Sequence, residues 1–246
     1  MKKKISVICP THQRRSLQKR FANSVFGTSA DPSTIEIVFG IDNNDDVALE
    51  TAEQLKEQFG KNSILVCKVE PNVEKLATIV NQCTKMATGE ILCNAADDVE
   101  FCADGWDQCV LQEFERYDDK IMLLWSDDGL WGGQLASHYF LHKNWVNCIG
   151  YAQPEIFYAD WTDHWVQNLA TTLGRGVLIR DRSRLFLRHR HAEFGGMEKD
   201  ETYHKVKARR ERNVEQNLTA NSPQFENLFL SEVSKLQNFI NEYKKT

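Results

Sequence analysis

The sequence predicts an α/β fold: one domain with a mainly parallel central sheet flanked by helices, followed by a C-terminal helical extension. Two observations lead to this prediction. Short runs rich in β-branched residues alternate with longer segments whose apolar side chains recur at helical spacing. Polar or acidic residues follow several of the strand-like runs, at the sheet edge where parallel sheets bind ligands. The length of 246 residues suits one large domain better than two equal ones.

The N-terminal part alternates strand and helix from its first residues. Residues 4–11 form a β-branched run that ends at Pro10, and the helix after it has apolar residues four apart. Asp45 and Asp46 can cap a further helix, and Gly60 can end it. The same patterns predict strands at 34–42, 62–70 and 90–95, and a helix at 73–88 that Gly89 ends.

The C-terminal part is less regular. Residues 129–161 are rich in glycine and aromatic residues, and this composition indicates a wall of the protein rather than a crossover between strands. Residues 225–243 form an amphipathic pattern that can dock on the body or on a second subunit, so a homodimer through this helix is possible. The remaining predictions are helices at 106–114 and 163–173 and strands at 120–129, 176–181 and 184–191.

The composition limits the partners and the compartment. A formal net charge of −5 argues against a protein that coats nucleic acid by bulk electrostatics. No segment is apolar for long enough to span a membrane. The seven cysteines are odd in number and never spaced as CxxC, which is typical of reduced thiols and indicates a cytoplasmic protein.

Two common nucleotide-binding signatures are missing. No GxGxxG motif follows the first strand, which disfavours a dinucleotide-dependent oxidoreductase, and no GxxxxGK[ST] motif indicates a P-loop NTPase. A sugar nucleotidylyltransferase would have a Gly- and Arg-rich loop after its first strand, where this chain has "PTHQRRS".

Two adjacent carboxylates, Asp97 and Asp98, follow the strand at 90–95. Oxygen ligands at such a position suit Mg²⁺ or Mn²⁺, which often share their coordination sphere with substrate phosphates. An ordinary turn or helix cap would explain the same pair. The neighbouring sequence therefore has to decide between the two interpretations.

Three stretches together resemble the nucleotide-sugar half of family 2 glycosyltransferases with the GT-A fold. They are "ISVICPTHQRR", "EIVFGID" and "NQCTKMATGEILCNAADD", within about residues 4–107. Shorter stretches, "GWD", "TDHW" and "RHRH…KDETY", resemble the acceptor half of small members of this group. The resemblance implies a GT-A-like, Rossmann-type domain divided into a nucleotide-sugar half (1–107), an acceptor-binding and catalytic half (108–203) and a helical extension (204–246).

The resemblance also implies roles for individual residues. Thr162-Asp163 stands where the family often has Glu-Asp, so Asp163 would be the catalytic base, with Asp160 as a rival and helix capping as the plain alternative. Asp128 would line the acceptor floor unless it belongs to an ordinary turn. The nucleotide and its diphosphate would be bound by Pro10, Thr11, Arg14, Asp42 and Asp97, and the divalent cation by Asp97, Asp98 and either His189 or His191.

The implied activity is a metal-dependent, inverting transfer of a sugar from a nucleotide donor, by analogy a UDP-sugar, to a hydroxyl acceptor. The acceptor would be a saccharide or a modified nucleobase in DNA. The basic run at 204–213 is either a solvated helix face or a contact surface for such a nucleic acid. Ala96 replaces the family's usual acid two residues before Asp98, so a non-catalytic nucleotide- or sugar-binding module on the same fold is the alternative.

Overall fold

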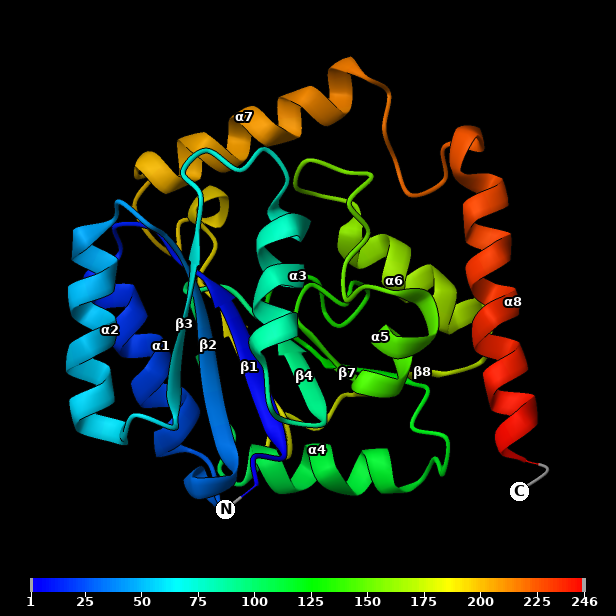
Figure 1. The fold of residues 1–246 in the computed structure, drawn as a ribbon, viewed down its shortest axis with the longest axis horizontal. Coiled ribbons are helices and arrows are strands. Elements are labelled where there is room, and N and C mark those ends of the chain that lie inside the picture. The colour runs from blue at the N-terminus through cyan, green and yellow to red at the C-terminus, as the bar shows by residue number, and fades with distance from the viewer. Residues whose placement is uncertain (1, 245–246) are drawn as a thin grey trace.

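The computed structural model describes residues 2–244, and within them the centre of the molecule is a seven-stranded mixed sheet (Figure 1). This confirms the predicted α/β class with a mainly parallel sheet. From one edge to the other the strands are β3 (Ile64–Val69), β2 (Ile35–Asp42), β1 (Ile5–Pro10), β4 (Ile91–Asn94), β7 (Tyr139–His142), β6 (Leu123–Ser126) and β8 (Gly176–Ile179).

Strands β1, β2, β3 and β4 run parallel to one another, and β6 runs parallel to β8. Strand β7 lies between β4 and β6 and is antiparallel to both. The register pairs Pro10 with Gly40 and Ile8 with Asn94, so β1, β2 and β4 end at one edge of the sheet. That shared carboxyl edge is where their terminal polar residues meet.

Helices cover both faces of the sheet because successive strand side chains point to opposite sides. Val7 packs in a core with α1, α2 and α4, whereas its neighbour Ile8 packs in a second core with α3. A third core joins β6 and β7 to α5, α6 and α8. The helices are α1 (Arg15–Gly27), α2 (Asp46–Phe59), α3 (Leu76–Met86), α4 (Trp106–Glu115), α5 (Lys143–Ile149), α6 (Thr162–Thr172), α7 (Glu201–Glu215) and α8 (Glu226–Tyr243), with short 3₁₀ turns at Pro32–Thr34, Ala192–Phe194 and Pro223–Phe225.

Several predicted boundaries were wrong, and the prediction for 129–161 was incomplete. The segment 129–161 contributes β7 to the centre of the sheet and also forms α5. Helix α3 begins at Leu76 rather than residue 73 and ends at Met86, before Gly89. The predicted strand at 184–191 shortens to β9 (Leu187–His189), which pairs with β5 (Val99–Phe101) in a separate two-stranded sheet.

Gly89 has a packing role instead of ending a helix. A Cβ atom there would lie 2.7 Å from Ser6 Oγ and 2.8 Å from the backbone of Ile5 and Ser6. The space is needed by a buried polar network at the amino edge of the sheet. Glu36 accepts hydrogen bonds from Ser6 Oγ (2.6 Å) and Thr88 Oγ1 (2.7 Å), while the amide of Gly89 donates to Ser6 Oγ (2.8 Å). This network fixes β1, β2 and the approach to β4.

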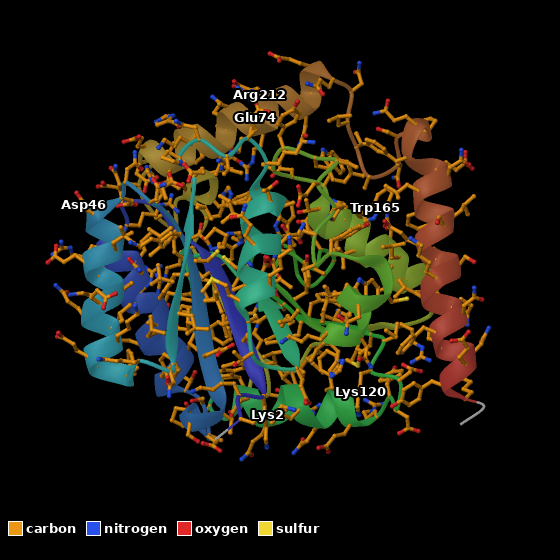
Figure 2. The ribbon with its side chains drawn as sticks, viewed as in Figure 1. Lys2, Asp46, Glu74, Lys120, Trp165 and Arg212 are labelled. Atoms are coloured by element: carbon orange, nitrogen blue, oxygen red, sulfur yellow. The ribbon has the colours of Figure 1, made fainter. Side chains whose placement is uncertain are left out.

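Helix α8 docks on the body of the same chain. The homodimer through this helix stays a prediction. Leu236 and Ile240 are buried against α5 and α6. Glu232 of α8 accepts a hydrogen bond from Trp165 Nε1 (2.9 Å) and another from the Tyr151 hydroxyl. Figure 2 shows Trp165 between α6 and α8. Among residues 2–244 no helix is long and apolar enough to cross a membrane, and all seven cysteines are free thiols.

Candidate active site

A cavity of about 260 Å³ opens at the carboxyl edge of the sheet, beneath α7. It forms where β1, β2 and β4 end, so residues far apart in the sequence meet there. Asp128 does not line it. The residues predicted for the site that do line it are Pro10, Thr11, Arg14, Asp42, Asp97, Asp98, Asp163, His189 and His191; the rival Asp160 lines it too.

Asp97 is buried and held by two partners from the loop that follows β1. Its Oδ2 accepts a hydrogen bond from Thr11 Oγ1 at 2.7 Å, and its Oδ1 lies 2.8 Å from Arg14 Nη1. Burial raises the pKa of Asp97 to about 6, although Arg14 opposes that shift. The same guanidinium binds Asp200, with Nε 2.6 Å and Nη2 2.7 Å from its carboxylate. Arg14 therefore links the carboxyl end of β4 to the start of α7.

Asp200 serves two purposes at the start of α7. Its Oδ1 accepts a hydrogen bond from the amide of Tyr203 at 2.9 Å, which caps the helix. Burial would raise the pKa of Asp200, but the hydrogen bond from Arg14 holds it below its usual value. The cap and the ion pair together fix α7 above the cavity.

Asp98 faces a different set of partners from Asp97. Its Oδ1 is buried, has no hydrogen-bond partner among residues 2–244, and lies 3.5 Å from His189 Nε2. Burial would raise the pKa of Asp98, but His189 and His138 hold it well below the usual range. The two adjacent carboxylates are therefore inequivalent, because only Asp97 has an arginine against it.

Asp128 lies behind His189 rather than in the cavity wall. Its Oδ1 accepts from the amides of Leu130 (2.9 Å) and Trp131 (3.0 Å), and its Oδ2 lies 3.6 Å from His189 Nδ1. The backbone carbonyl of Asp128 also accepts the amide of His189 at 2.9 Å. Burial alone would lower the pKa of His189, but the carboxylates of Asp128 and Asp98 raise it to about 9. Asp128 thus orients the imidazole from outside the cavity.

The donor atoms around Asp98 suit a divalent cation bound jointly with a substrate. Asp98 Oδ1 is a buried carboxylate oxygen with no hydrogen-bond partner among residues 2–244, and it lies beside the buried ring of His189. A cation there would displace the proton that the carboxylates favour on His189, and oxygen with imidazole nitrogen is a set that Mn²⁺ accepts. Among residues 2–244 no group of three or more His, Cys, Asp or Glu side chains is arranged to hold a metal. Two protein ligands completed by substrate phosphates and water are a common arrangement for such cations.

His191 is engaged differently from His189. Its Nδ1 accepts the amide of Glu193 at 3.2 Å, and its Nε2 lies 3.2 Å from Arg210 Nη2. Burial lowers the pKa of His191. Arg210 also binds Asp160, with Nε 3.0 Å from Oδ1. Of the two predicted histidines, His191 is thus already in contact with an arginine.

The two candidate bases differ in their surroundings. Asp160 is paired with Arg210, and burial raises its pKa. Asp163, in the first turn of α6, lines the cavity and accepts a hydrogen bond from the amide of His164 at 2.8 Å. The ring of His164 lies 3.0 Å from the same carboxylate oxygen. Of these two carboxylates, Asp163 is the one without an arginine partner among the described residues.

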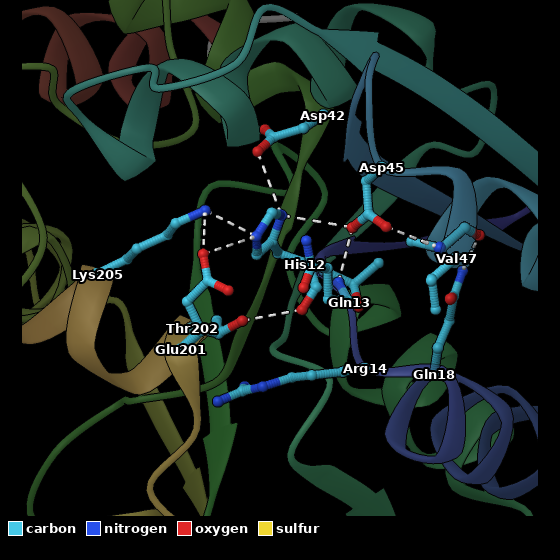
Figure 3. Close-up of polar contacts among 12 residues, drawn as sticks. His12, Gln13, Arg14, Gln18, Asp42, Asp45, Val47, Glu201, Thr202 and Lys205 are labelled. Atoms are coloured by element: carbon cyan, nitrogen blue, oxygen red, sulfur yellow. Dashed lines mark hydrogen bonds and ion pairs between the residues drawn. The ribbon is translucent and has the colours of Figure 1, made fainter.

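His12 is a central contact that the sequence prediction missed. Its Nδ1 lies 3.2 Å from Asp42 Oδ2 and 3.3 Å from Asp45 Oδ2, and its Nε2 lies 2.7 Å from Lys205 Nζ (Figure 3). Its backbone carbonyl accepts from Thr202 Oγ1 at 2.8 Å. His12 follows Pro10-Thr11 directly, so its position at the strand end was the available signal.

Other cavity residues had no clear sequence signal. Lys205, Arg209 and Arg210 lie on α7 within a run that also fits a solvated helix face, and α7 buries only Asn213. Structure is needed to show which of these cations face the cavity. His138 lies in the segment predicted as an aromatic wall, where a single histidine has no distinguishing pattern.

Comparison with known proteins connects this geometry to a family. The family model described as Glycosyl transferase family 2 matches residues 6–164, which is more than half of the chain. The matched region contains the ends of β1, β2 and β4, together with Asp97, Asp98 and Asp163. No curated protein sequence matches the chain.

Solved structures share the fold at low sequence identity. A structure of S. aureus TarS has a TM-score of 0.60 and 15% identity, covering 78% of this chain and 38% of that one. The 1–349 fragment of TarS in complex with UDP-GlcNAc has a TM-score of 0.59 and 16% identity, covering 82% and 64%. A mannosyltransferase from Pyrobaculum calidifontis in complex with GDP-Man and Mn²⁺ has a TM-score of 0.63 and 13% identity, covering 99% and 74%. This chain therefore spans well under half the length of the first TarS structure.

Proposed function

The chain belongs to glycosyl transferase family 2, and on that basis we propose that it transfers a sugar from a nucleotide-sugar donor to a hydroxyl acceptor. The reaction takes place in the cavity at the carboxyl edge of the sheet. The observation that supports this most is the convergence of nine predicted site residues on that one cavity. Complexes of similar proteins contain UDP-GlcNAc or GDP-Man, so nucleoside diphosphate sugars are the donor class to test, UDP-sugars first.

Residues at the ends of β1 and β2 bind the nucleotide. Asp42 presents a carboxylate that can accept a hydrogen bond from the base. Thr11 and Arg14 line the same cavity and donate hydrogen bonds to Asp97. Lys205 and Arg209 line the same cavity from α7 and place positive charge where the diphosphate would lie. A cation in a cavity of low polarity attracts an anion more strongly than it does in water.

Asp98 and His189 would hold the divalent cation, Mn²⁺ or Mg²⁺. When bound, the cation supplies Lewis-acid stabilisation of the charge on the leaving diphosphate. Asp97 stays paired with Arg14, so its part is to keep the guanidinium in place beside the cation site. Asp128 orients His189 through its carboxylate and its backbone carbonyl.

Asp163 is the base in this proposal. It takes the proton of the acceptor hydroxyl as that oxygen attacks the sugar, a contribution of about 10²–10⁴-fold in rate. Attack on the face opposite the leaving group inverts the anomeric centre, through an oxocarbenium-like transition state as in glycoside hydrolysis. A saccharide and a modified nucleobase in DNA are both hydroxyl acceptors of the required kind.

A thermal-shift screen tests the proposal. The protein is heated with UDP, GDP, UDP-GlcNAc and GDP-mannose, each with Mn²⁺ or with EDTA. We expect stabilisation that needs both a nucleotide and the metal, about 2.7 kcal/mol when the ligand is at 100 times its Kd. Asp98→Asn should abolish this metal-dependent stabilisation, because the variant lacks a ligand of the cation. Asp46→Asn, on the outer end of α2 (Figure 2), is the matched control and should behave as wild type.

The results also separate the enzyme from the alternative. Metal-dependent nucleotide binding without hydrolysis or transfer of the sugar would indicate a binding module on this fold. Absence of nucleotide binding under every condition would reject the enzyme and a nucleotide-binding module, and would leave only a sugar-binding module. Turnover that is lost in Asp163→Asn while nucleotide binding is kept would support Asp163 as the base.

A further inference from the structure

Two buried polar side chains in the cavity wall, His138 and Gln153, each leave at least one hydrogen-bonding atom without a partner among residues 2–244. His138, just before β7, is 7% exposed, and neither of its ring nitrogens has a hydrogen-bond partner among the described residues. Gln153 is 4% exposed, and its Oε1 is likewise unpaired. An unsatisfied buried polar atom destabilises a protein, and native proteins leave few of them. Both residues line the cavity, so a bound ligand is the natural partner.

The two side chains are held in place by contacts that leave these atoms free. The ring of His138 packs edge-on against the ring of His189, with 4.6 Å between centroids. Gln153 donates through Nε2 to the hydroxyl of Tyr139 at 3.3 Å, and its backbone amide donates to Asn81 Oδ1 at 3.1 Å. These contacts therefore fix the orientation of both side chains in the cavity wall.

The chemistry of the unpaired atoms selects one class of ligand group. A neutral imidazole offers one N–H donor and one acceptor nitrogen, and the Gln153 oxygen adds a second acceptor. Phosphate oxygens only accept hydrogen bonds, so a diphosphate would leave both acceptors unsatisfied. A hydroxyl both donates and accepts, so a group that carries several hydroxyls satisfies all three atoms.

We propose that His138 and Gln153 form a subsite that binds hydroxyl groups of the sugar being transferred. This proposal rests on the function proposed above. His138 contacts His189, which is assigned there to the cation beside the diphosphate, and the group bonded to that diphosphate is the sugar. Both side chains are more than nine-tenths buried, so they can contact only a group that fills the cavity. The subsite therefore reads the donor and sets which sugar is used.

Calorimetric titrations of nucleotides into the protein test the subsite. The wild type is titrated in Mn²⁺ with UDP and UDP-GlcNAc and with GDP and GDP-mannose, and the pair that binds more tightly is kept. His138→Ala and Gln153→Met are then titrated with both members of that pair, in Mn²⁺ and in EDTA. His204→Ala is the matched control, because His204 lies on the exposed side of α7 and does not line the cavity.

We expect each cavity variant to bind the sugar nucleotide about tenfold more weakly, as for a lost hydrogen bond of about 1.4 kcal/mol. Binding of the nucleoside diphosphate should change less than about twofold, since its phosphates make no contact with this subsite. His204→Ala should match the wild type with both ligands. Equal weakening of the two ligands, or no change with either, would overturn the proposal. Loss of the Mn²⁺ dependence in His138→Ala would overturn it too, because His138 would then be a metal ligand.

These outcomes are distinct from failure of the proposed function, which would appear as absence of nucleotide binding by the wild type. If a variant does not fold, the wild type itself gives the answer by nitrogen-15 NMR of its imidazoles. In Mg²⁺, which does not broaden NMR signals as Mn²⁺ does, the ring nitrogens of His138 should shift further with the sugar nucleotide than with the nucleoside diphosphate, whose cation reaches only the neighbouring His189. Identical spectra with the two ligands would contradict the subsite.

Discussion

The pairing of Arg14 with Asp97 makes a sharp prediction, because it assigns different tasks to two adjacent carboxylates. The pair is separated by 2.8 Å, and the side chains are 11% and 3% exposed. Removing one partner of a buried pair costs about 3–5 kcal/mol, since the other charge stays buried. Arg14→Met should therefore lower the free energy of unfolding by about 3 kcal/mol, the low end of that range because Arg14 keeps some exposure.

The second variant completes a double-mutant cycle. Near pH 7, Asp97→Asn should cost less than Arg14→Met, about 1 kcal/mol or less, because burial already raises the pKa of Asp97 and Asp200 still holds Arg14. The double variant lacks the unpaired carboxylate, so its loss should be smaller than the sum of the two single losses. We expect a coupling energy of about 2 kcal/mol, within the usual range for residues in contact.

Urea unfolding in EDTA measures the cycle without any contribution from metal. The neighbouring pair of Arg15 and Glu50 is the matched control, since its side chains are 45% and 58% exposed and 2.6 Å apart. Its coupling should stay below about 1 kcal/mol. Losses for Arg14→Met and Asp97→Asn that simply add would refute the assignment of Asp97 as the counter-ion of Arg14.

Three further predictions concern the packing that supports the site. Gly89→Ala should destabilise the protein by about 3 kcal/mol in urea unfolding, because its Cβ meets backbone at 2.8 Å, whereas Gly27→Ala has nothing within 4 Å and should change stability by less than about 1 kcal/mol. Leu236→Ala, fully buried in α8, should cost about 2–5 kcal/mol, and Leu230→Ala, 56% exposed, should be close to neutral by the same measurement. Burial raises the pKa of Glu232, so its contribution to stability is fully present below the ordinary glutamate pKa of about 4.3 and is lost as pH rises through the higher folded value. Glu232→Gln should therefore gain stability relative to wild type as the pH rises above about 4.3, and parallel stability curves would contradict this.

The elements with a strong local pattern could be predicted from the sequence. Strand β2 and helix α2 were confirmed, because an apolar run and a helix cap are local signals, and Asp45 caps α2 by accepting from the amide of Ala48 at 3.0 Å. Strand β7 was missed because its four residues occupy the middle of the sheet through pairing with β4 and β6, which is a long-range effect. Propensity in a short aromatic segment does not reveal such pairing.

The candidate site divides in the same way. Residues at the ends of predicted parallel strands, such as Asp42 and Asp97, could be placed at one edge because topology brings those ends together. The partners of each carboxylate could not be predicted, since Arg14 and Asp200 are far apart in the sequence and meet only through the position of α7. His138 could not be found at all, because its significance is that its ring nitrogens have no hydrogen-bond partner within residues 2–244, which only the three-dimensional structure reveals.

The hydrogen-bonded network around Glu36 has a practical consequence for redesign. It joins three strands at the amino edge of the sheet, opposite to the cavity, and uses none of the residues that line the cavity. A mutant library that randomises cavity positions in search of another sugar leaves the Glu36 network unchanged. A change of donor selectivity therefore need not involve this network, provided that the library also keeps Arg14 and Asp97, whose ion pair stabilises the cavity edge.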